Sequence, residues 1–220
     1  MDYYDDLDES DTELQYRHGI SLAEEALRVF PEILAASVSL QRQITTAAEI
    51  SPELLKKIAL IIDTNLAAFY VARDGPRWMD LKLVEMKEAG LVYVYYTPPT
   101  DPDQIACFLS FLITYESGVK VLYLYEVHVL QQFQGKRLGA RLLAGLHQLA
   151  TDLQQNGGAL YNPVGTALTV FSDNTKAFAW YKKEKYILSP GSPQDKRLRS
   201  GKLRKPEYYI MVRLNQARFT

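Results

Sequence analysis

The sequence predicts an α/β domain in which helices flank a mixed, mainly antiparallel central sheet. A helix, a strand and two further helical stretches come first. Three strand-like segments rich in Val, Leu and Tyr follow at 91–96, 105–115 and 119–129. After these segments, helical and strand-like stretches alternate to the end of the chain. Strands that follow one another directly favour antiparallel pairing. The alternation of helices and strands adds a crossover connection, which joins parallel strands, so antiparallel and parallel pairing are both expected in one sheet.

The first ninety residues are expected to form three helices and one strand. Ser21-Leu22-Ala23-Glu24 has the pattern of a capping box that opens a helix, which Pro31 would break. Residues 36–43 alternate as a first strand. Ser51-Pro52 combines an N-cap with proline at the first helical position, and this helix is expected to run to about residue 72. A further helix spans 79–89 and closes at residue 90.

The stretch 119–150 is the most informative part of the chain. A strand runs to Val129, the glycine-containing loop 134–140 turns the chain, and apolar residues at helical spacing follow. Such a loop points backbone N–H groups at one spot where a helix begins, and that spot favours phosphate. The dinucleotide fingerprint and the Walker loop are excluded, because the glycines are spaced differently and no Gly-Lys-Ser/Thr occurs.

The C-terminal part predicts three strands and one helix. Residues 168–171 have a strand pattern, and Ser172, Asp173 and Asn174 are N-cap candidates for a helix over 175–183. Strands near 186–189 and at 208–214 complete the expected sheet.

Composition limits the possible classes. The 220 residues suffice for one domain with a sizeable core, expected over residues 16–220. The single cysteine, Cys107, lies in an apolar run and is interpreted as a core residue, and it excludes an internal disulfide and a cysteine zinc site. No apolar run reaches the roughly 18 residues of a membrane-spanning helix, and the acidic N-terminus is unlike a signal peptide.

Charge is segregated although the net charge is only −1, which gives no overall nucleic-acid signature. Residues 2–13 carry seven acids and no base, so residues 1–15 are expected to be an acidic, disordered tail. Residues 196–205 carry six bases. A mobile surface loop is the simplest interpretation of this basic segment; contact with an acidic chromatin surface or with cofactor phosphates are the alternatives.

Together the loop 134–140 and the segment 167–186 resemble the GCN5-related N-acetyltransferase (GNAT) superfamily. Gln134 and Gly139 match its cofactor motif, Gln/Arg-x-x-Gly-x-Gly/Ala, and Asn174 and Tyr181 match its later Asn-started helix. The resemblance implies a GNAT fold and acetyl-CoA as cosubstrate, with no metal. Arg137 departs from the pattern, because the superfamily usually has glycine there. The implied cofactor-binding residues are Val127, His128, Val129, Gln134, Gly135, Lys136, Arg137, Leu138, Gly139, Ala140, Asn174 and Tyr181.

Further segments, at 123–127, 168–174, 189–193 and 208–210, are similar to the NatD family of N-terminal acetyltransferases within this superfamily. That family acetylates the Ser-Gly-Arg-Gly start of histone 4 and histone 2A, so the resemblance implies these tails as partners and a nuclear and cytoplasmic location. It implies a monomer with no nucleic-acid readout and no membrane contact. The implied catalytic residues are Glu126 and Tyr125, and the implied peptide-binding residues are Tyr70, Glu116, Tyr123, Tyr125, Thr169 and Tyr208. Thr114 stands where such sequences can carry a second acid for the substrate arginine.

The chemistry sets modest demands on a base. An α-amine has a reference pKa of about 7.7–8.0 and a lysine side chain about 10.4, so deprotonation near pH 7.4 costs roughly 0.5 and about 4 kcal/mol respectively. Glu126 acting through a water suffices for an N-terminal amine. Direct transfer in a ternary complex is expected, because the only thiol is core-like. We expect His128 to contribute its backbone rather than a catalytic side chain, and Tyr181 to contact the cofactor without being a required acid.

Three alternatives stay open at the level of sequence. They are a broader N-terminal acetyltransferase, a lysine acetyltransferase and a non-catalytic acetyl-CoA-binding module.

Overall fold

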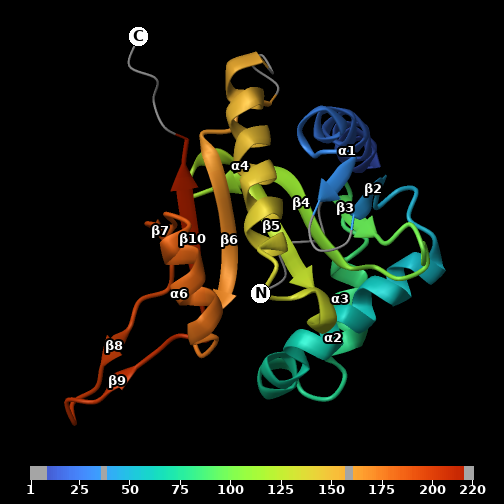
Figure 1. Cartoon of the computed structure of the whole chain (residues 1–220). Coiled ribbons are helices and arrows are strands. Elements are labelled where there is room, and N and C mark those ends of the chain that lie inside the picture. The colour runs from blue at the N-terminus through green and yellow to red at the C-terminus, as the bar shows by residue number, and fades with distance from the viewer. Residues whose placement is uncertain (1–8, 36–38, 157–160, 216–220) are drawn as a thin grey trace.

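An eight-stranded sheet runs through the computed structural model, which describes residues 9–35, 39–156 and 161–215 (Figure 1). The strand order is β1-β2-β3-β4-β5-β6-β10-β7, and a separate two-stranded sheet pairs β8 with β9. The strands are β1 (Ile33–Ala35), β2 (Ser39–Thr46), β3 (Val92–Thr97), β4 (Cys107–Glu116), β5 (Val119–Val129), β6 (Gly165–Phe171), β7 (Ile187–Leu188), β8 (Lys196–Arg197), β9 (Leu203–Arg204) and β10 (Tyr208–Leu214).

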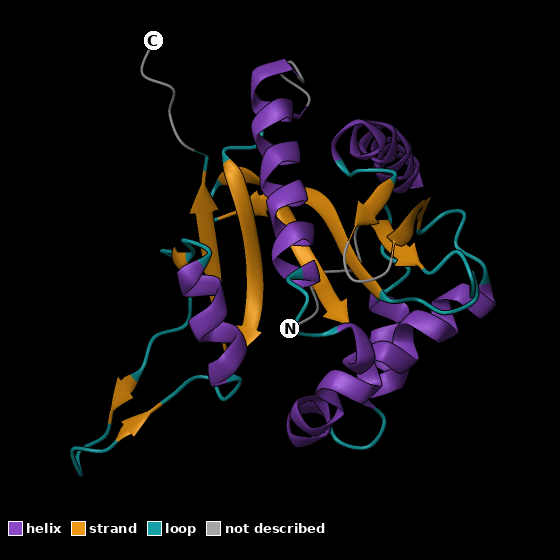
Figure 2. Cartoon of the chain, in the orientation of Figure 1, coloured by secondary structure: helices purple, strands orange, loops and turns teal. Residues whose placement is uncertain are grey.

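All pairings in the large sheet are antiparallel except that of β5 with β6, which is parallel. The crossover between these two strands contains α4 (Leu138–Asn156). The predicted class, a mixed and mainly antiparallel sheet flanked by helices, is therefore confirmed (Figure 2).

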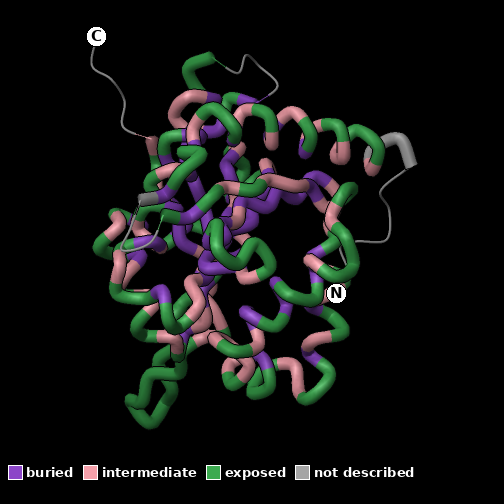
Figure 3. Tube along the Cα trace, turned by 45° about the vertical axis from the view of Figure 1, so that its right-hand side comes forward, coloured by how far each residue is buried: buried purple, intermediate pink, exposed green. Residues whose placement is uncertain are grey.

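The two larger hydrophobic cores lie against the sheet, one on each face. The first combines the apolar sides of α1 (Glu9–Val29) and α4 with Tyr181 of α6 (Thr175–Lys183). The second packs α2 (Pro52–Asp74) and α3 (Trp78–Glu85) against the other face, with Phe108 among the buried strand residues. Figure 3 shows this buried interior surrounded by exposed helix faces and loops. Cys107 belongs to the first core, as predicted.

Local capping explains two helix boundaries that the sequence predicts. The Ser51 side chain accepts a hydrogen bond from the Leu54 N–H, Pro52 follows it, and Gly75 ends α2 with a φ of 76°. The Asn174 side chain accepts from the Ala177 N–H and opens α6. A short polar side chain satisfies an otherwise unpaired N–H at each of these helix starts.

Several predicted boundaries are wrong. Helix α1 already begins at Glu9, so Ser21 lies inside a helix and the tail predicted for residues 1–15 overlaps its first turns. Acidic residues suit a helix N-terminus, because they interact favourably with its dipole, and the charge pattern alone did not reveal this. Residues 1–8 lie outside the described part. The single strand predicted at 36–43 is replaced by β1 and β2, and residues 36–38 between them are not described. Helix α3 ends at Glu85 rather than at residue 89.

No helix in the described segments combines the length and apolar character needed to cross a membrane.

Candidate active site

The parallel strands β5 and β6 separate part-way along their length. They pair at Leu122–Thr166, Tyr123–Ala167 and Leu124–Leu168, and the pairing stops there although both strands continue. Figure 1 shows the two strands diverging. The β6-facing side of residues 127–129 therefore has no strand partner, and a cleft of about 1840 Å³ opens at this point.

The loop that precedes α4 has the backbone of an anion site. Gly135 has a φ of 75° and Arg137 a φ of 60°, and α4 starts directly afterwards. The Arg141 N–H is the first to bond within the helix, to the carbonyl of Arg137, so the N–H groups of residues 138–140 have no intrahelical partner. The Gln134 side chain donates to the carbonyl of Val129 at 3.0 Å and ties the loop to the end of β5.

Arg137 occupies the position where the superfamily motif has glycine, and its backbone adopts the left-handed conformation that favours glycine. A non-glycine residue pays about 1–2 kcal/mol for this conformation. The loop keeps its shape despite this cost, and the Arg137 side chain is exposed.

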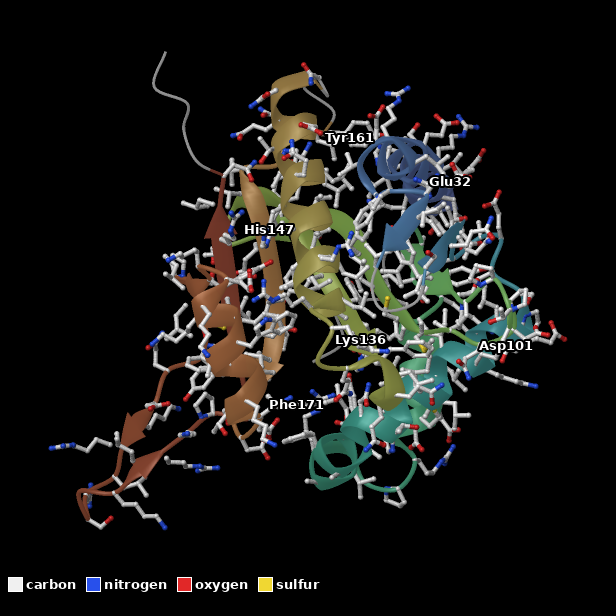
Figure 4. All side chains as sticks on the ribbon, viewed as in Figure 1. Glu32, Asp101, Lys136, His147, Tyr161 and Phe171 are labelled. Atoms are coloured by element: carbon white, nitrogen blue, oxygen red, sulfur yellow. The ribbon has the colours of Figure 1, made fainter. Side chains whose placement is uncertain are left out.

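The predicted cofactor residues divide into those that line the cleft and those that do not. The cleft is lined by Val127, His128, Val129, Gln134, Gly135, Gly139, Asn174 and Tyr181. The side chains of Lys136, Arg137, Leu138 and Ala140 are not in its lining, and Leu138 is buried in the core. For these residues the structure offers backbone N–H groups at the helix start rather than side chains. Figure 4 shows Lys136 beside the start of α4 and Phe171 at the end of β6.

A β-bulge in β5 brings the acid and the tyrosines to one face. Ser110 lies opposite Glu126 while Phe111 lies opposite Leu124, so Tyr125 is an extra residue with no partner of its own. Strict alternation would place Tyr125 and Glu126 on opposite faces. The bulge reverses the alternation, and both side chains instead meet residues of α3 and of the turn that follows it.

Glu126 lies at the centre of a buried polar network. Its Oε1 is 2.5 Å from the ammonium of Lys82 and accepts a hydrogen bond from the Tyr70 hydroxyl at 3.1 Å. Its Oε2 lies 2.6 Å from Nε2 of His128. Lys82 also pairs with Glu85 at 2.5 Å. The sequence pattern did not identify Lys82, because a lysine in the middle of a helix is normally solvated.

His128 is held on both ring nitrogens. Its Nδ1 lies 3.0 Å from Nδ2 of Asn65, and its Nε2 faces Glu126. With the Asn65 amide donating to Nδ1, the neutral ring carries its proton on Nε2 and donates it to the carboxylate. The side chain of His128 thus contacts the acid directly, in addition to the cofactor role expected for its backbone, which stays a prediction.

Burial and charge act in opposite directions on Glu126. Burial raises the pKa of the carboxyl, but the positive charge of Lys82 and the contacts with His128 outweigh it and lower the pKa to about 2. Burial lowers the pKa of Lys82, and the carboxylates of Glu126 and Glu85 outweigh it and raise that pKa above its usual value. Glu126 is a carboxylate and Lys82 an ammonium at neutral pH.

The predicted peptide-binding tyrosines lie close to this network. The Tyr123 hydroxyl is 2.6 Å from the Thr169 hydroxyl, and Tyr125 donates to Glu88 at 2.5 Å. The Tyr123 and Tyr125 rings meet edge to face at 5.8 Å, and Tyr70 stacks on Trp78. Tyr70, Tyr123, Tyr125 and Thr169 all line the cleft.

Two predicted substrate residues do not line the cleft. The Glu116 carboxylate accepts hydrogen bonds from Ser117 at 2.7 Å and Ser189 at 2.5 Å, so it holds the loop after β7. Tyr208 begins β10 opposite Phe171; Phe171 lines the cleft and Tyr208 lies beside it. Both positions are set by contacts that are remote in sequence, which the strand pattern does not encode.

Residues that the sequence did not single out complete the cleft. Asn65, Lys82, Glu85 and Glu88 approach from the α2–α3 side, and Trp180 from α6. A Cβ on Gly139 would lie 3.4 Å from Trp180, which is an ordinary van der Waals contact, so the packing of α4 against α6 does not itself require glycine there. Among the described residues, no group of three or more His, Cys, Asp or Glu side chains is placed to hold a metal ion.

A model of the acetyltransferase (GNAT) family matches residues 62–185, which is more than half of the chain. The chain belongs to the GNAT acetyltransferase family. The matched region runs from α2 to the end of α6 and contains both strands of the cleft.

A curated relative and two solved structures are consistent with this GNAT membership. N-alpha-acetyltransferase 40 of Saccharomyces cerevisiae is 38% identical over 159 residues, which cover 64% of this chain and 54% of the relative. This chain thus spans about half the length of the curated relative that it matches.

The two solved structures share the fold. The crystal structure of PH1933 from Pyrococcus horikoshii OT3 is 16% identical, with a TM-score of 0.54 over 80% of this chain and 99% of that chain. An acyl-CoA N-acyltransferase from Pseudomonas aeruginosa is 13% identical, with a TM-score of 0.51 over 80% of this chain and 99% of that chain. At these identities the likeness concerns the fold, which is the GNAT fold.

Proposed function

We propose that this protein transfers an acetyl group from acetyl-CoA to the free α-amine of a protein N-terminus. The observation that carries the proposal is the Glu126 carboxylate, buried and paired with Lys82 and His128 where β5 and β6 separate. The tyrosines beside it line the cleft. The 38% identity to an enzyme named N-alpha-acetyltransferase supports the same reaction.

The residues present fit acetyl-CoA as a cosubstrate. The unpaired side of residues 127–129 suits the amide groups of a pantetheine arm, which would extend the sheet like a short strand. The N–H groups at the start of α4 suit its pyrophosphate. Asn174 and Tyr181 lie along the same cleft. When bound, acetyl-CoA supplies the activated thioester.

The low pKa of Glu126 favours an α-amine over a lysine side chain. Moving a proton from an α-amine to a carboxyl of pKa about 2 costs about 8 kcal/mol, so Glu126 does not hold the proton for long. It orients the amine or a bridging water and passes the proton to solvent. An α-amine is already partly neutral near pH 7.4, whereas a lysine amine is almost wholly charged. We propose Glu126 as a catalytic residue on this basis, and Tyr125 as the second because the bulge in β5 places it in the cleft beside Glu126.

Tyr181 stays protonated, since burial, with smaller effects from the neighbouring Tyr186 and Glu126, raises its pKa. Its hydroxyl is available as a hydrogen-bond donor in the cleft. We keep Tyr181 as a cofactor contact.

Direct transfer without an acetyl-enzyme follows from the position of the only thiol. Cys107 is fully buried, and burial raises its pKa to about 12. Cys107→Ala should keep more than half of the activity, and intact-protein mass spectrometry after incubation with acetyl-CoA should show no added acetyl group. A hundredfold loss with unchanged folding would contradict direct transfer.

For the substrate, we propose the Ser-Gly-Arg-Gly start of histone 4 and histone 2A. The similarity of segments 123–127, 168–174 and 208–210 to the NatD family supports this choice. A monomer acting in the nucleus and the cytoplasm follows from the same proposal, and gel filtration and imaging of a tagged protein would test these two points.

The decisive experiment is mass spectrometry of a Ser-Gly-Arg-Gly-Lys peptide incubated with the protein and acetyl-CoA, alongside the same peptide with a blocked N-terminus. Acetylation of the free N-terminus alone is expected. Acetylation of the lysine in the blocked peptide would indicate a lysine acetyltransferase. Binding of acetyl-CoA without turnover on any free N-terminus would indicate a non-catalytic module.

A further inference from the structure

A basic hairpin projects from the body of the molecule at the end of the sheet that carries α6. It comprises β8, β9 and the turn between them, and we call residues 196–205 the basic arm (Figure 1). Every residue of the arm is exposed. Figure 3 shows the exposed hairpin extending away from the body. The segment lies on the surface, as expected, and the structure adds that its two short strands pair with each other.

Both ends of the arm are fastened to the domain. The Tyr209 hydroxyl donates to Asp195 at 2.5 Å on one side. On the other side, Ser172 donates through its side chain to the carbonyl of Pro206 and through its N–H to that of Glu207. At the tip, Leu198 and residues 201–202 close the turn by backbone hydrogen bonds. The arm is thus a built element with a fixed attachment.

The positive charge of the basic arm is not neutralised by ion pairs with the described residues. The six cations are Lys196, Arg197, Arg199, Lys202, Arg204 and Lys205, and residues 196–205 contain no acid. None of the six takes part in an ion pair with a described residue. Since the whole chain has a net charge of −1, the rest of it carries about −7 and would repel a polyanion.

We propose that the basic arm binds the phosphate backbone of double-helical nucleic acid without reading its sequence. Six unpaired cations on a narrow ribbon suit closely spaced phosphates, and a two-stranded ribbon is narrow enough to enter a DNA major groove. The arm contains no aromatic residue, so it lacks the stacking platforms that single strands require. This binding is independent of the catalytic cleft, because no arm residue lines it.

The test measures binding of the full-length protein to 20-base-pair DNA and RNA duplexes by fluorescence anisotropy between 50 and 200 mM KCl. We expect micromolar affinity at low salt and a log–log salt slope between about −3.6 and −5.4, as four to six phosphate contacts predict. Comparison of the dissociation constants for the DNA and RNA duplexes shows which duplex the protein prefers.

A matched pair of variants locates the site. Lys202→Gln, Arg204→Gln and Lys205→Gln combined should weaken binding at least tenfold and reduce the slope by about 2–3. The control combines Arg17→Gln, Lys56→Gln and Arg77→Gln, which change the net charge equally on exposed positions of α1, α2 and the loop before α3. The control should leave the slope unchanged. Thermal unfolding checks that both variants fold.

A further comparison separates nucleic acid from an acidic protein partner. Leu198 and Leu203 are 43% and 57% exposed on the arm and would anchor a protein surface. Leu198→Ser with Leu203→Ser should leave duplex binding unchanged. Three results would overturn the proposal: equal weakening by the control variant, no duplex binding at 50 mM KCl, or capture of a polyglutamate peptide in preference to both duplexes.

Discussion

The ammonium of Lys82 and the carboxylate of Glu126 form an ion pair 2.5 Å long, with the two side chains only 3% and 7% exposed. The pair joins α3 to the bulged part of β5. The pair keeps Glu126 ionised at the point where β5 and β6 stop pairing. Because both charges are buried, the stability of this region depends on both partners.

Breaking the pair from one side should be costly. Lys82→Met leaves Glu126 buried without its countercharge, and we expect a loss of about 3–5 kcal/mol in the free energy of unfolding. Combining it with Glu126→Leu removes both charges and should recover much of that loss. Urea unfolding of the wild type, both single variants and the double variant measures the coupling. Additive losses in the double variant would show that the two charges do not interact.

The acetylation rate should depend on Glu126, but the pH–rate profile should not show the titration of its carboxyl group. Glu126→Gln should lower kcat by roughly 10–100-fold at pH 7, and higher pH should rescue part of the loss because more of the amine is neutral. Since the carboxyl pKa is about 2, the acidic limb of kcat/KM should follow the substrate amine in both enzymes. The pH–rate profiles from pH 6 to 9 check this. Equal kcat for the two enzymes across that range would exclude Glu126 as the base.

Replacing Glu116 should change the KM for an arginine-containing peptide and for its alanine counterpart by the same factor. Glu116→Ala removes the acceptor of the Ser117 and Ser189 hydroxyls, and we expect a loss of about 1–3 kcal/mol in stability. Because the carboxylate does not line the cleft, KM should change by the same factor for Ser-Gly-Arg-Gly and Ser-Gly-Ala-Gly. Ser189→Ala is the matched control for the loop. A selective loss on the arginine peptide would instead support Glu116 as the residue that reads the arginine.

The free energy of unfolding should decrease in mild acid, because His147 is buried in its neutral form. Burial, with the nearby Arg213 charge, lowers its pKa to about 3, while the unfolded chain has about 6.5. The unfolded state therefore binds the proton first as pH falls, so this contribution is complete above pH 6.5 and is lost progressively toward pH 3. At pH 5 the loss is about 2 kcal/mol.

His147→Gln tests this assignment, because glutamine does not titrate and keeps a polar group near the Tyr186 hydroxyl, which lies 3.1 Å from His147. Chemical unfolding at pH 7.5 and pH 5 should show a smaller difference for the variant than for the wild type. All other residues are the same in both proteins, so their contributions cancel in the comparison. Equal differences would rule out His147 as the source.

Local signals in the sequence predicted most elements and part of the site. The helix at 175–183 and the strand at 208–214 were predicted with their observed bounds, because Asn174 caps the helix and the strand residues pair along their whole length. The loop before α4 was predicted from its glycines, since φ angles above zero and a helix start are properties of a few adjacent residues. The start of α1 at Glu9 and the division of the first strand into β1 and β2 were missed.

By itself the sequence determined the fold class, the strand–loop–helix unit and the acid Glu126, because periodicity, caps and glycine positions act over short distances. Only the tertiary structure decided which side chains surround that acid. Tyr125 and Glu126 are neighbours that alternation would separate, and the bulge opposite Ser110 brings them to one face. Lys82 reaches the carboxylate from another element, and Glu116 turns toward Ser189 instead of the cleft. These outcomes depend on strand register and packing between distant segments, which no local pattern records.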